Sequence, residues 1–269
     1  MNEKVALVTG AGTGIGKGIA LELAKAGYAV AIHYNSSLEG AKQTKAAIEQ
    51  NGGRAELIQA DLNSQVGHKA LFEKFDQLFD RLDAYVNNAG VQRTAPFLEV
   101  THELFDNVCN VNWRSCYFGV AEAGRRMAEK GIRGSIVLIG SNHQFVTFPD
   151  DSVYGVFGEA VHKFTRHAAI EFARYQIRVN CIAPGWTHND KPGREEQFYE
   201  ASLERIPLGR WVTPEQIGKQ TVFFCSDKAS FITGACLVAD GGAMCFGKKQ
   251  TPKEKEEQMK TLQTLLERT

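Results

Sequence analysis

The stretch Val5–Gly18 reads VALVTGAGTGIGKG and decides the fold. It starts with apolar or β-forming residues, continues through glycines at positions 10, 12, 14 and 16, and leads into an amphipathic segment from Ile19. This order predicts a strand, a tight glycine turn and a helix. Glycines let the backbone approach a phosphate closely, and a helix N-terminus presents peptide N–H groups to an anion. We therefore expect a pyrophosphate site, with an ordinary glycine-rich loop as the alternative.

Composition and charge exclude several classes of protein. The chain has 269 residues, and 31 Lys and Arg balance 31 Asp and Glu, so we expect no nucleic-acid partner. No apolar run reaches the roughly 18 residues of a membrane span, and the N-terminus lacks a signal-peptide pattern. We therefore expect a cytoplasmic protein that does not contact a membrane. The six cysteines form no CxxC pair, which predicts reduced thiols and no metal site.

Strand-like and helix-like segments alternate along the chain. The predicted strands are Val5–Thr9, Tyr28–Tyr34, Ala55–Ala60, Ala84–Asn87, Ser135–Ile139, Ile177–Ile182 and Leu237–Ala239. The predicted helices are Gly14–Ala26, Glu39–Gln50, Ser64–Phe79, Leu104–Met127 and Tyr154–Tyr175. This alternation is typical of an α/β fold, a Rossmann-type doubly wound parallel sheet in three α/β/α layers. We expect a single domain over residues 1–246 and a charged, helix-prone tail over residues 247–269.

Further motifs follow the glycine turn in a fixed order. They are Thr9–Gly16, Asp61, Asn87–Gly90, Asn112, Ser141, Tyr154, Pro184–Gly185 and Asp240–Gly242, with Ser141 placed 13 residues before Tyr154. In these motifs the chain resembles the classical short-chain dehydrogenases/reductases over residues 3 to about 246. The resemblance implies a nicotinamide cofactor and hydride transfer between a small carbonyl compound and its alcohol. It also implies a homo-oligomer, a tetramer or a dimer.

The resemblance implies which residues bind the cofactor. They are Gly10, Thr13, Gly14, Ile15, Gly16, Tyr34, Asn35, Ser36, Asp61, Leu62, Asn88, Ala89, Gly90, Tyr154, Pro184, Gly185 and Thr187. Members that prefer NAD place an acidic residue at the end of the second strand, where it binds the ribose hydroxyls. Here residues 33–37 read HYNSS, with no carboxylate. We therefore expect NADP(H) in preference to NAD(H).

The catalytic unit of the family consists of Asn, Ser, Tyr and a Lys four residues after the Tyr. By position, Asn112 would hold a water in a proton relay, Ser141 would polarise the substrate, and Tyr154 would be the general acid/base. The lysine position is Gly158 in this chain. Without a nearby cation a phenol keeps a pKa near 10, which makes it a poor base at neutral pH. His143, two residues after Ser141, is the candidate replacement, and a surface histidine is the alternative.

Gly158 leaves three functions open. The first is a slow or altered NADP(H)-linked oxidoreductase. The second is a dinucleotide-binding protein with little turnover. The third is an enzyme whose site has been repurposed, so that Tyr154 and His143 catalyse dehydration or isomerisation. An engineered inactive variant would give the same sequence. We favour the first, because the cofactor motifs and three of the four catalytic residues are present. We expect the loop Trp186–Trp211 to bind the substrate.

Overall fold

The computed structural model describes residues 3–188, 199, 202–245 and 259–260. Within these residues one parallel sheet contains β1 (Lys4–Val8), β2 (Tyr28–Tyr34), β3 (Ala55–Gln59), β4 (Ala84–Asn87), β5 (Ser135–Ile139), β6 (Arg178–Pro184) and β7 (Cys236–Ala239). The strand order is β3-β2-β1-β4-β5-β6-β7. The direction of strand addition reverses at β1, which pairs with both β2 and β4. Open α/β sheets bind ligands at such a reversal, outside the carboxyl ends of the strands.

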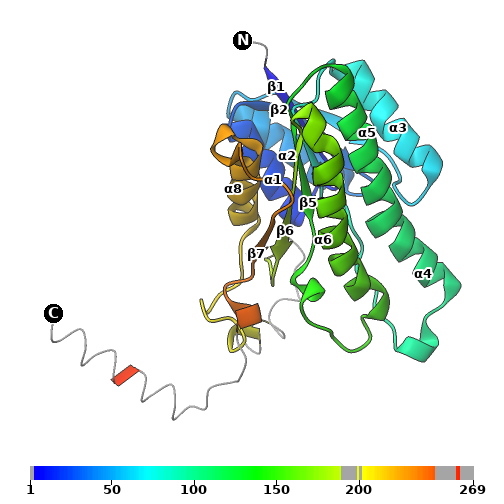
Figure 1. The fold of residues 1–269 in the computed structure, drawn as a ribbon, viewed down its shortest axis with the longest axis vertical. Helices are drawn as coiled ribbons and strands as arrows, with labels where there is room; N and C mark the ends of the chain where they lie inside the picture. Colours follow the sequence, from blue (N-terminus) through cyan, green and yellow to red (C-terminus); the bar gives the residue numbers. More distant parts are fainter. Residues whose placement is uncertain (1–2, 189–198, 200–201, 246–258, 261–269) are drawn as a thin grey trace.

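Helices cover both faces of the sheet (Figure 1). They are α1 (Gly14–Lys25), α2 (Leu38–Gln50), α3 (Gln65–Leu78), α4 (His102–Val108), α5 (Ser115–Glu129), α6 (Ser152–Phe172) and α8 (Pro214–Cys225). On one face α1, α2 and α8 bury side chains such as Ile19, Ile48 and Phe224. On the other face α3, α5 and α6 bury Phe72 and Val161 among others. The three-layer sandwich therefore has two apolar cores, one on each face of the sheet. Each fully buried side chain of this kind stabilises the fold by about 1.5–3 kcal/mol.

The central strands are buried on both sides. Every residue of Tyr28–Tyr34 is buried, and so is every residue of Ala84–Asn87. A parallel sheet covered by helices on both faces favours continuous apolar runs over alternating patterns. The predicted doubly wound α/β fold is therefore confirmed, and the sheet fixes the position of the loops that follow its strands.

Several predicted boundaries differ from the structure. The predicted helix Leu104–Met127 extends from His102 to Glu129, and a π-helical segment, Cys109–Arg114, separates α4 from α5. The predicted sixth strand ends at Pro184, two residues later than expected. Helix α8 was not predicted. None of the helices in the described residues is both long enough and apolar enough to cross a membrane.

Two predicted segments fall largely beyond what the structure describes. The tail over residues 247–269 lies outside the described residues apart from 259 and 260. Residues 189–198 and 200–201 of the predicted substrate loop also lie outside them.

Candidate active site

The glycine turn, residues 9–16, joins β1 to α1 where the strand order reverses. Gly14 has a φ of +53°, a backbone conformation that residues with a Cβ rarely adopt. A Cβ at Gly16 would lie 2.2 Å from the carbonyl oxygen of Gly10, so only glycine allows this close approach. The first turn of α1 contains no acidic side chain. An anion at this helix N-terminus would meet no like charge on the helix and would be attracted by its dipole.

The side chain of His33 connects the glycine turn to the sheet through hydrogen bonds. Its Nδ1 accepts a hydrogen bond from the Gly10 N–H at 3.1 Å, and its Nε2 lies 3.1 Å from the carbonyl oxygen of Ala60. Because a backbone N–H can only donate, the ring proton must be on Nε2, which donates to Ala60. Burial lowers the pKa of His33 to about 4. The ring is therefore neutral at pH 7 and connects three strand ends.

A cleft of about 730 Å³ lies at the carboxyl ends of the central strands. Most of the predicted cofactor residues line it: Gly10, Thr13, Gly14, Ile15, Gly16, Asn35, Ser36, Asp61, Leu62, Asn88, Ala89, Gly90 and Thr187. Tyr34 does not, because its side chain is buried in the core beneath α1 and α2. Pro184, the last residue of β6, and Gly185, which follows it, are not part of this lining, and a Cβ at Gly185 would lie 2.7 Å from the Asp240 side chain. The cleft thus brings together distant motifs of the chain.

Sequence reasoning missed part of this lining. The additional residues are His33, Ser37, Asn63, Val91, Gln92, Arg93, Asn107, Val111 and His188. Gln92 and Arg93 directly follow the Asn88–Gly90 motif, so extending that motif by three residues would have found them. His188 directly follows Thr187, a predicted cofactor residue, whereas Asn107 carries no such signal because only the folded chain brings it to the cleft.

Asn88 connects the glycine turn to the end of β4. Thr9 Oγ1 accepts hydrogen bonds from the N–H groups of Asn88 at 2.9 Å and Ala89 at 3.0 Å. In return, Asn88 Nδ2 donates to the carbonyl oxygens of Thr9 at 2.9 Å and Gly10 at 3.2 Å. The predicted Asn-Ala-Gly motif therefore fixes the shape of the cleft floor through hydrogen bonds to the turn.

The other end of the cleft contains Asp61. Its Oδ1 accepts hydrogen bonds from the Asn63 N–H at 3.0 Å and from Asn35 Nδ2 at 3.4 Å. Asn35 and Ser36 present an amide and a hydroxyl to the cleft beyond β2. Both are groups that hydrogen-bond a phosphate without repelling it.

A smaller pocket of about 220 Å³ shares a wall with the cleft. Ile15 and residues 88–92 line both cavities. The lining of the pocket also contains three of the predicted catalytic residues, Asn112, Ser141 and Tyr154. A reactive group placed in the pocket would thus be adjacent to one end of a molecule in the cleft.

Asn112 lies in the π-helical segment between α4 and α5. Its Oδ1 accepts from the Val91 N–H and its Nδ2 donates to the Val91 carbonyl oxygen, both at 2.8 Å. Single π-helical turns inside α-helices often occur at functional sites, because they change the direction of side chains and carbonyl groups. Here the side chain holds the shared wall, so any water relay would have to use the backbone of Asn112.

Tyr154 is the central titratable group of the pocket. Burial raises the pKa of its phenol, the hydrogen bond with Ser141 opposes this, and the nearby charge of Asp151 raises the pKa further. Among the described residues, no cation lowers it. The phenol therefore stays protonated well above neutral pH, which suits a general acid better than a general base.

His143 lies beside Tyr154 and forms a tight pair with a carboxylate. Its Nδ1 donates to Asp151 Oδ2 at 2.6 Å. The imidazole packs edge-on to Tyr154, with ring centroids 5.5 Å apart, and against Phe148 at 4.4 Å. Asp151 is 4% exposed, and its Oδ1 has no hydrogen-bond partner among the described residues. The sequence analysis named His143 but missed Asp151, which lies eight residues away at the start of α6.

Gly158 is buried one helical turn beyond Tyr154. A Cβ at this position would lie 3.0 Å from the backbone nitrogen of Gln144 and 3.4 Å from its Cα. Gln144 ends the short 3-10 turn that follows Ser141. The turn thus packs directly against the glycine, and a side chain there would displace it by a few tenths of an ångström.

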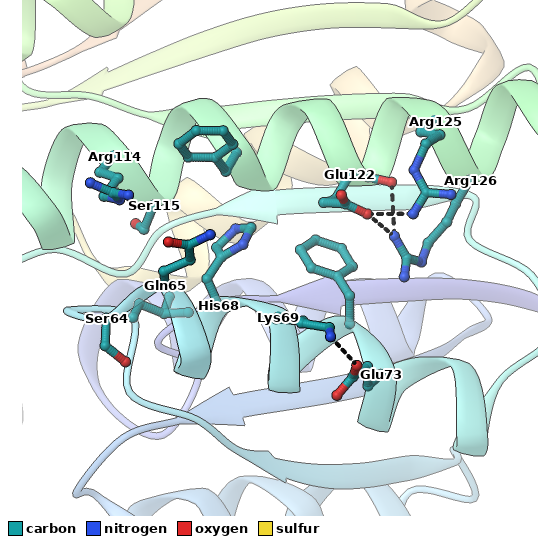
Figure 2. A pocket seen from close by; sticks show the side chains of 13 residues that line it. Ser64, Gln65, His68, Lys69, Glu73, Arg114, Ser115, Glu122, Arg125 and Arg126 are labelled. Carbon is teal, nitrogen blue, oxygen red and sulfur yellow. Dashed lines mark hydrogen bonds and ion pairs between the residues drawn. The ribbon is translucent and has the colours of Figure 1, made fainter.

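A second cavity, about 430 Å³, lies between α3 and α5, away from this site. Figure 2 shows Glu122 bonded to both Arg125 and Arg126, and Lys69 to Glu73. Its lining shares only Leu62 with the cleft. Because its charged groups largely pair with one another, we do not assign it to the active site. No cluster of His, Cys, Asp or Glu that could hold a metal ion occurs in the described part of the chain.

Comparisons with known proteins agree with this geometry. The sequence model of a family described as enoyl-(acyl carrier protein) reductase matches residues 10–244. The uncharacterized oxidoreductase YohF of Escherichia coli (strain K12) is 34% identical over 250 residues, 93% of this chain and 99% of that protein. Glucose 1-dehydrogenase 2 of Bacillus subtilis (strain 168) is 33% identical over 246 residues, 90% of this chain and 95% of that protein.

Solved structures give the same result. The crystal structure of the angucycline C-6 ketoreductase LanV with bound NADP superposes with a TM-score of 0.86 at 33% identity, covering 90% of this chain and 96% of that one. The protein belongs to the short-chain dehydrogenase/reductase family. It is accordingly an oxidoreductase.

Proposed function

We propose that the protein interconverts a small carbonyl compound and its alcohol by NADP(H)-dependent hydride transfer. The observation that carries the proposal is the shared wall, which places the Tyr154 and Ser141 hydroxyls next to one end of a long cleft. A dinucleotide in the cleft and a carbonyl group in the pocket would both lie against Ile15 and residues 88–92. The glucose dehydrogenase and ketoreductase relatives support the reaction class.

The cleft fits a nicotinamide dinucleotide. The glycine turn offers backbone where a Cβ at Gly16 would clash, which suits a pyrophosphate at the start of α1. Asp61 would lie near the adenine, and Asn35 with Ser36 would bind a 2′-phosphate. When bound, NADP(H) supplies the hydride or accepts it. The lack of a carboxylate beyond β2 and the NADP-bound ketoreductase both support NADP(H) over NAD(H).

The protonated phenol sets the favoured direction. Reduction requires a proton donor at the developing alkoxide, and the raised pKa of Tyr154 keeps that proton available at neutral pH. Ser141, hydrogen-bonded to Tyr154, would polarise the same oxygen. Oxidation would instead require the phenolate, which is scarce at pH 7. We therefore propose carbonyl reduction as the faster direction near neutral pH.

By the resemblance, Gly158 stands at the position of the family lysine, and among the described residues no cation lowers the pKa of Tyr154. The pair of His143 and Asp151 is the candidate compensation. With its Nδ1 proton held by the carboxylate, the ring has Nε2 as the nitrogen that can exchange a proton or bind a substrate hydroxyl. The edge-on contact with Tyr154 puts the imidazole beside the phenol ring, although His143 is not among the residues that line the pocket.

Binding and turnover together test the proposal. Fluorescence titration should show NADPH binding more tightly than NADH, and binding of neither would refute it. NADPH consumption should then be measured over a panel of ketones, diketones and aldoses. Tyr154→Phe should reduce turnover by about 10²–10⁴-fold. The matched control Tyr175→Phe, 41% exposed in the 3-10 turn that follows α6, should leave turnover unchanged.

A non-redox reaction at the same site is the second candidate. It is favoured by Gly158, because the turn at Gln144 occupies the space next to it and no cation of the described residues supports phenolate formation. Tyr154 and His143 would then act as an acid/base pair for dehydration or isomerisation. Conversion of a hydroxy-carbonyl substrate without a change in NADPH absorbance would favour this candidate over hydride transfer.

We also propose that the chain forms a homodimer or homotetramer through α5 and α6. Trp113, Tyr117 and Phe164 pack against one another along a cavity of about 480 Å³ between the two helices. Tyr117, which lines this cavity, and the adjacent Phe118 are each 47% exposed, which leaves aromatic surface of α5 for a partner subunit to cover. Light scattering at micromolar concentration should report at least a dimer, and a monomer would contradict the proposal.

A further inference from the structure

Two cysteines face each other at the edge of the sheet. Cys181 in β6 and Cys236 in β7 are register partners in a parallel pair. Register partners on neighbouring strands have Cα atoms about 4.8 Å apart and project to the same face. Disulfides span Cα distances of about 4.4–6.8 Å, so these two thiols can be joined without moving the strands. The two thiols are close enough for each to shift the pKa of the other.

The two thiols differ in access. Cys181 is fully buried under the loop after β5, where a Cβ at Gly140 would lie 3.1 Å from its Sγ. Cys236 is only half-buried. Its Sγ accepts a hydrogen bond from Gln144 Nε2 at 3.2 Å. Cys236 is therefore partly exposed to solvent, whereas Cys181 is not.

The same contacts separate the acidities of the thiols. The hydrogen bond from Cys181 lowers the pKa of the Cys236 thiol; Gln144 and the charge of Arg166 lower it further, while burial and Glu159 act in the opposite direction. That bond also holds the pKa of Cys181 well above its ordinary value. The thiolate, which is the nucleophilic form, therefore develops on the accessible sulfur.

We propose that Cys236 is a site of oxidation by hydrogen peroxide or an alkyl hydroperoxide, and that Cys181 converts the product to an intrachain disulfide. The Cys236 thiolate attacks a peroxide oxygen, the S–O bond forms, the O–O bond breaks, and hydroxide or alkoxide leaves. The Cys181 sulfur then attacks the sulfenic acid, the S–S bond forms, the S–O bond breaks, and water leaves with the Cys181 proton. Two thiols are oxidised and one peroxide is reduced.

The pair is connected to the active site through Gln144. The Gln144 N–H donates to the Ser141 carbonyl oxygen at 3.2 Å, in the turn that also contains His143. Within the described residues its side-chain Oε1 has no partner, so the amide is held by its bond to Cys236. A disulfide sulfur is a weaker acceptor than a thiolate. Oxidation therefore loosens the turn that positions Ser141 and lowers turnover until a thiol reductant reverses it; this consequence rests on the proposed function.

Peptide mapping tests the modification itself. The intact protein is treated with hydrogen peroxide, free thiols are blocked with iodoacetamide, and peptides are identified by mass spectrometry. We expect a Cys181–Cys236 cross-link that dithiothreitol removes. In Cys181→Ser, dimedone should trap a sulfenic acid on Cys236. The matched control Cys245→Ser removes an exposed thiol and should leave the cross-link unchanged.

The proposal fails if peroxide modifies Cys245 or Cys109 while Cys181 and Cys236 are both recovered as blocked thiols. Mapping of the wild-type chain decides this even if a cysteine variant folds poorly. Mapping also requires no catalytic activity, so its outcome is independent of the proposed function. A complete cross-link without loss of turnover in an active enzyme would refute the connection through Gln144.

Discussion

Gly158→Lys places a cation one helical turn from the phenol of Tyr154. Residues four apart on a helix share a face and are separated by about 6 Å along the axis. A cation within about 4–6 Å lowers the pKa of an acid by about 1–3 units. Below its pKa, each unit raises the phenolate fraction about tenfold. Alcohol oxidation near pH 7.5 should therefore increase by about 10- to 1000-fold, while carbonyl reduction changes little.

The substitution has opposing effects on stability. Glycine in a helix interior is about 1 kcal/mol less favourable than alanine or lysine, so the helix gains that amount. The new Cβ lies 3.0 Å from the Gln144 nitrogen, which requires the turn to shift. Because the two effects oppose each other, we expect a change in the free energy of unfolding of no more than about 1 kcal/mol.

Gly158→Ala is the matched control, because it introduces the same Cβ without the charge. Initial rates of alcohol oxidation should be measured for both variants from about pH 7 to pH 10, where an unperturbed phenol titrates. The lysine variant should reach its plateau at a lower pH than the alanine variant. Coincident pH profiles for the two variants, with both folded by circular dichroism, would refute the electrostatic reasoning.

Three further predictions concern groups around the site. Asp151→Asn removes the charged acceptor that orients His143, so we expect turnover to fall about tenfold or more. Adding His143→Ala to this variant should lower turnover little further, and additive losses would contradict a shared role of the two residues. His33 has a folded pKa of about 4, below its unfolded value near 6.5. The contribution of His33 to the free energy of unfolding is therefore complete above about pH 6.5 and falls by about 3 kcal/mol towards pH 4. Urea unfolding at a series of pH values should show this loss in wild type but not in His33→Gln. Parallel plots of unfolding free energy against pH for the two proteins would contradict it. Asn35→Arg adds a cation where a 2′-phosphate is expected. Fluorescence titration should show that the variant binds NADPH about tenfold more tightly, with its affinity for NADH unchanged. Equal effects on both cofactors would place the 2′-phosphate elsewhere.

Local sequence signals predicted the fold well. The apolar run of β1 and the glycine turn act over a few residues, and each element of the alternating pattern can be recognised from its own segment. Helix α8 was missed although its start is marked by Thr213 and Gln216, which form a capping box around Pro214. The capping box is a local signal, so helix α8 could have been predicted from the sequence. The π-helical segment around Asn112 depends on packing, so it could not.

The candidate site was less predictable where it depends on pairs of distant residues. Tyr34 adjoins the cofactor motif in sequence, but the strand turns its side chain into the core. The contact between His143 and Asp151 exists only because the loop between them folds back onto α6. Cys181 and Cys236 are 55 residues apart and meet through strand register. Motifs identify residues at a site, whereas their hydrogen-bond partners depend on the fold.

Isotope transfer tests the central claim most directly. NADPH deuterated at the transferable C4 position should be incubated with the enzyme and the most active carbonyl compound of the panel, and the product analysed by mass spectrometry. We predict one deuterium on the carbinol carbon of the product, and about 10²–10⁴-fold slower labelling with Tyr154→Phe. A product formed without deuterium would contradict hydride transfer at this site.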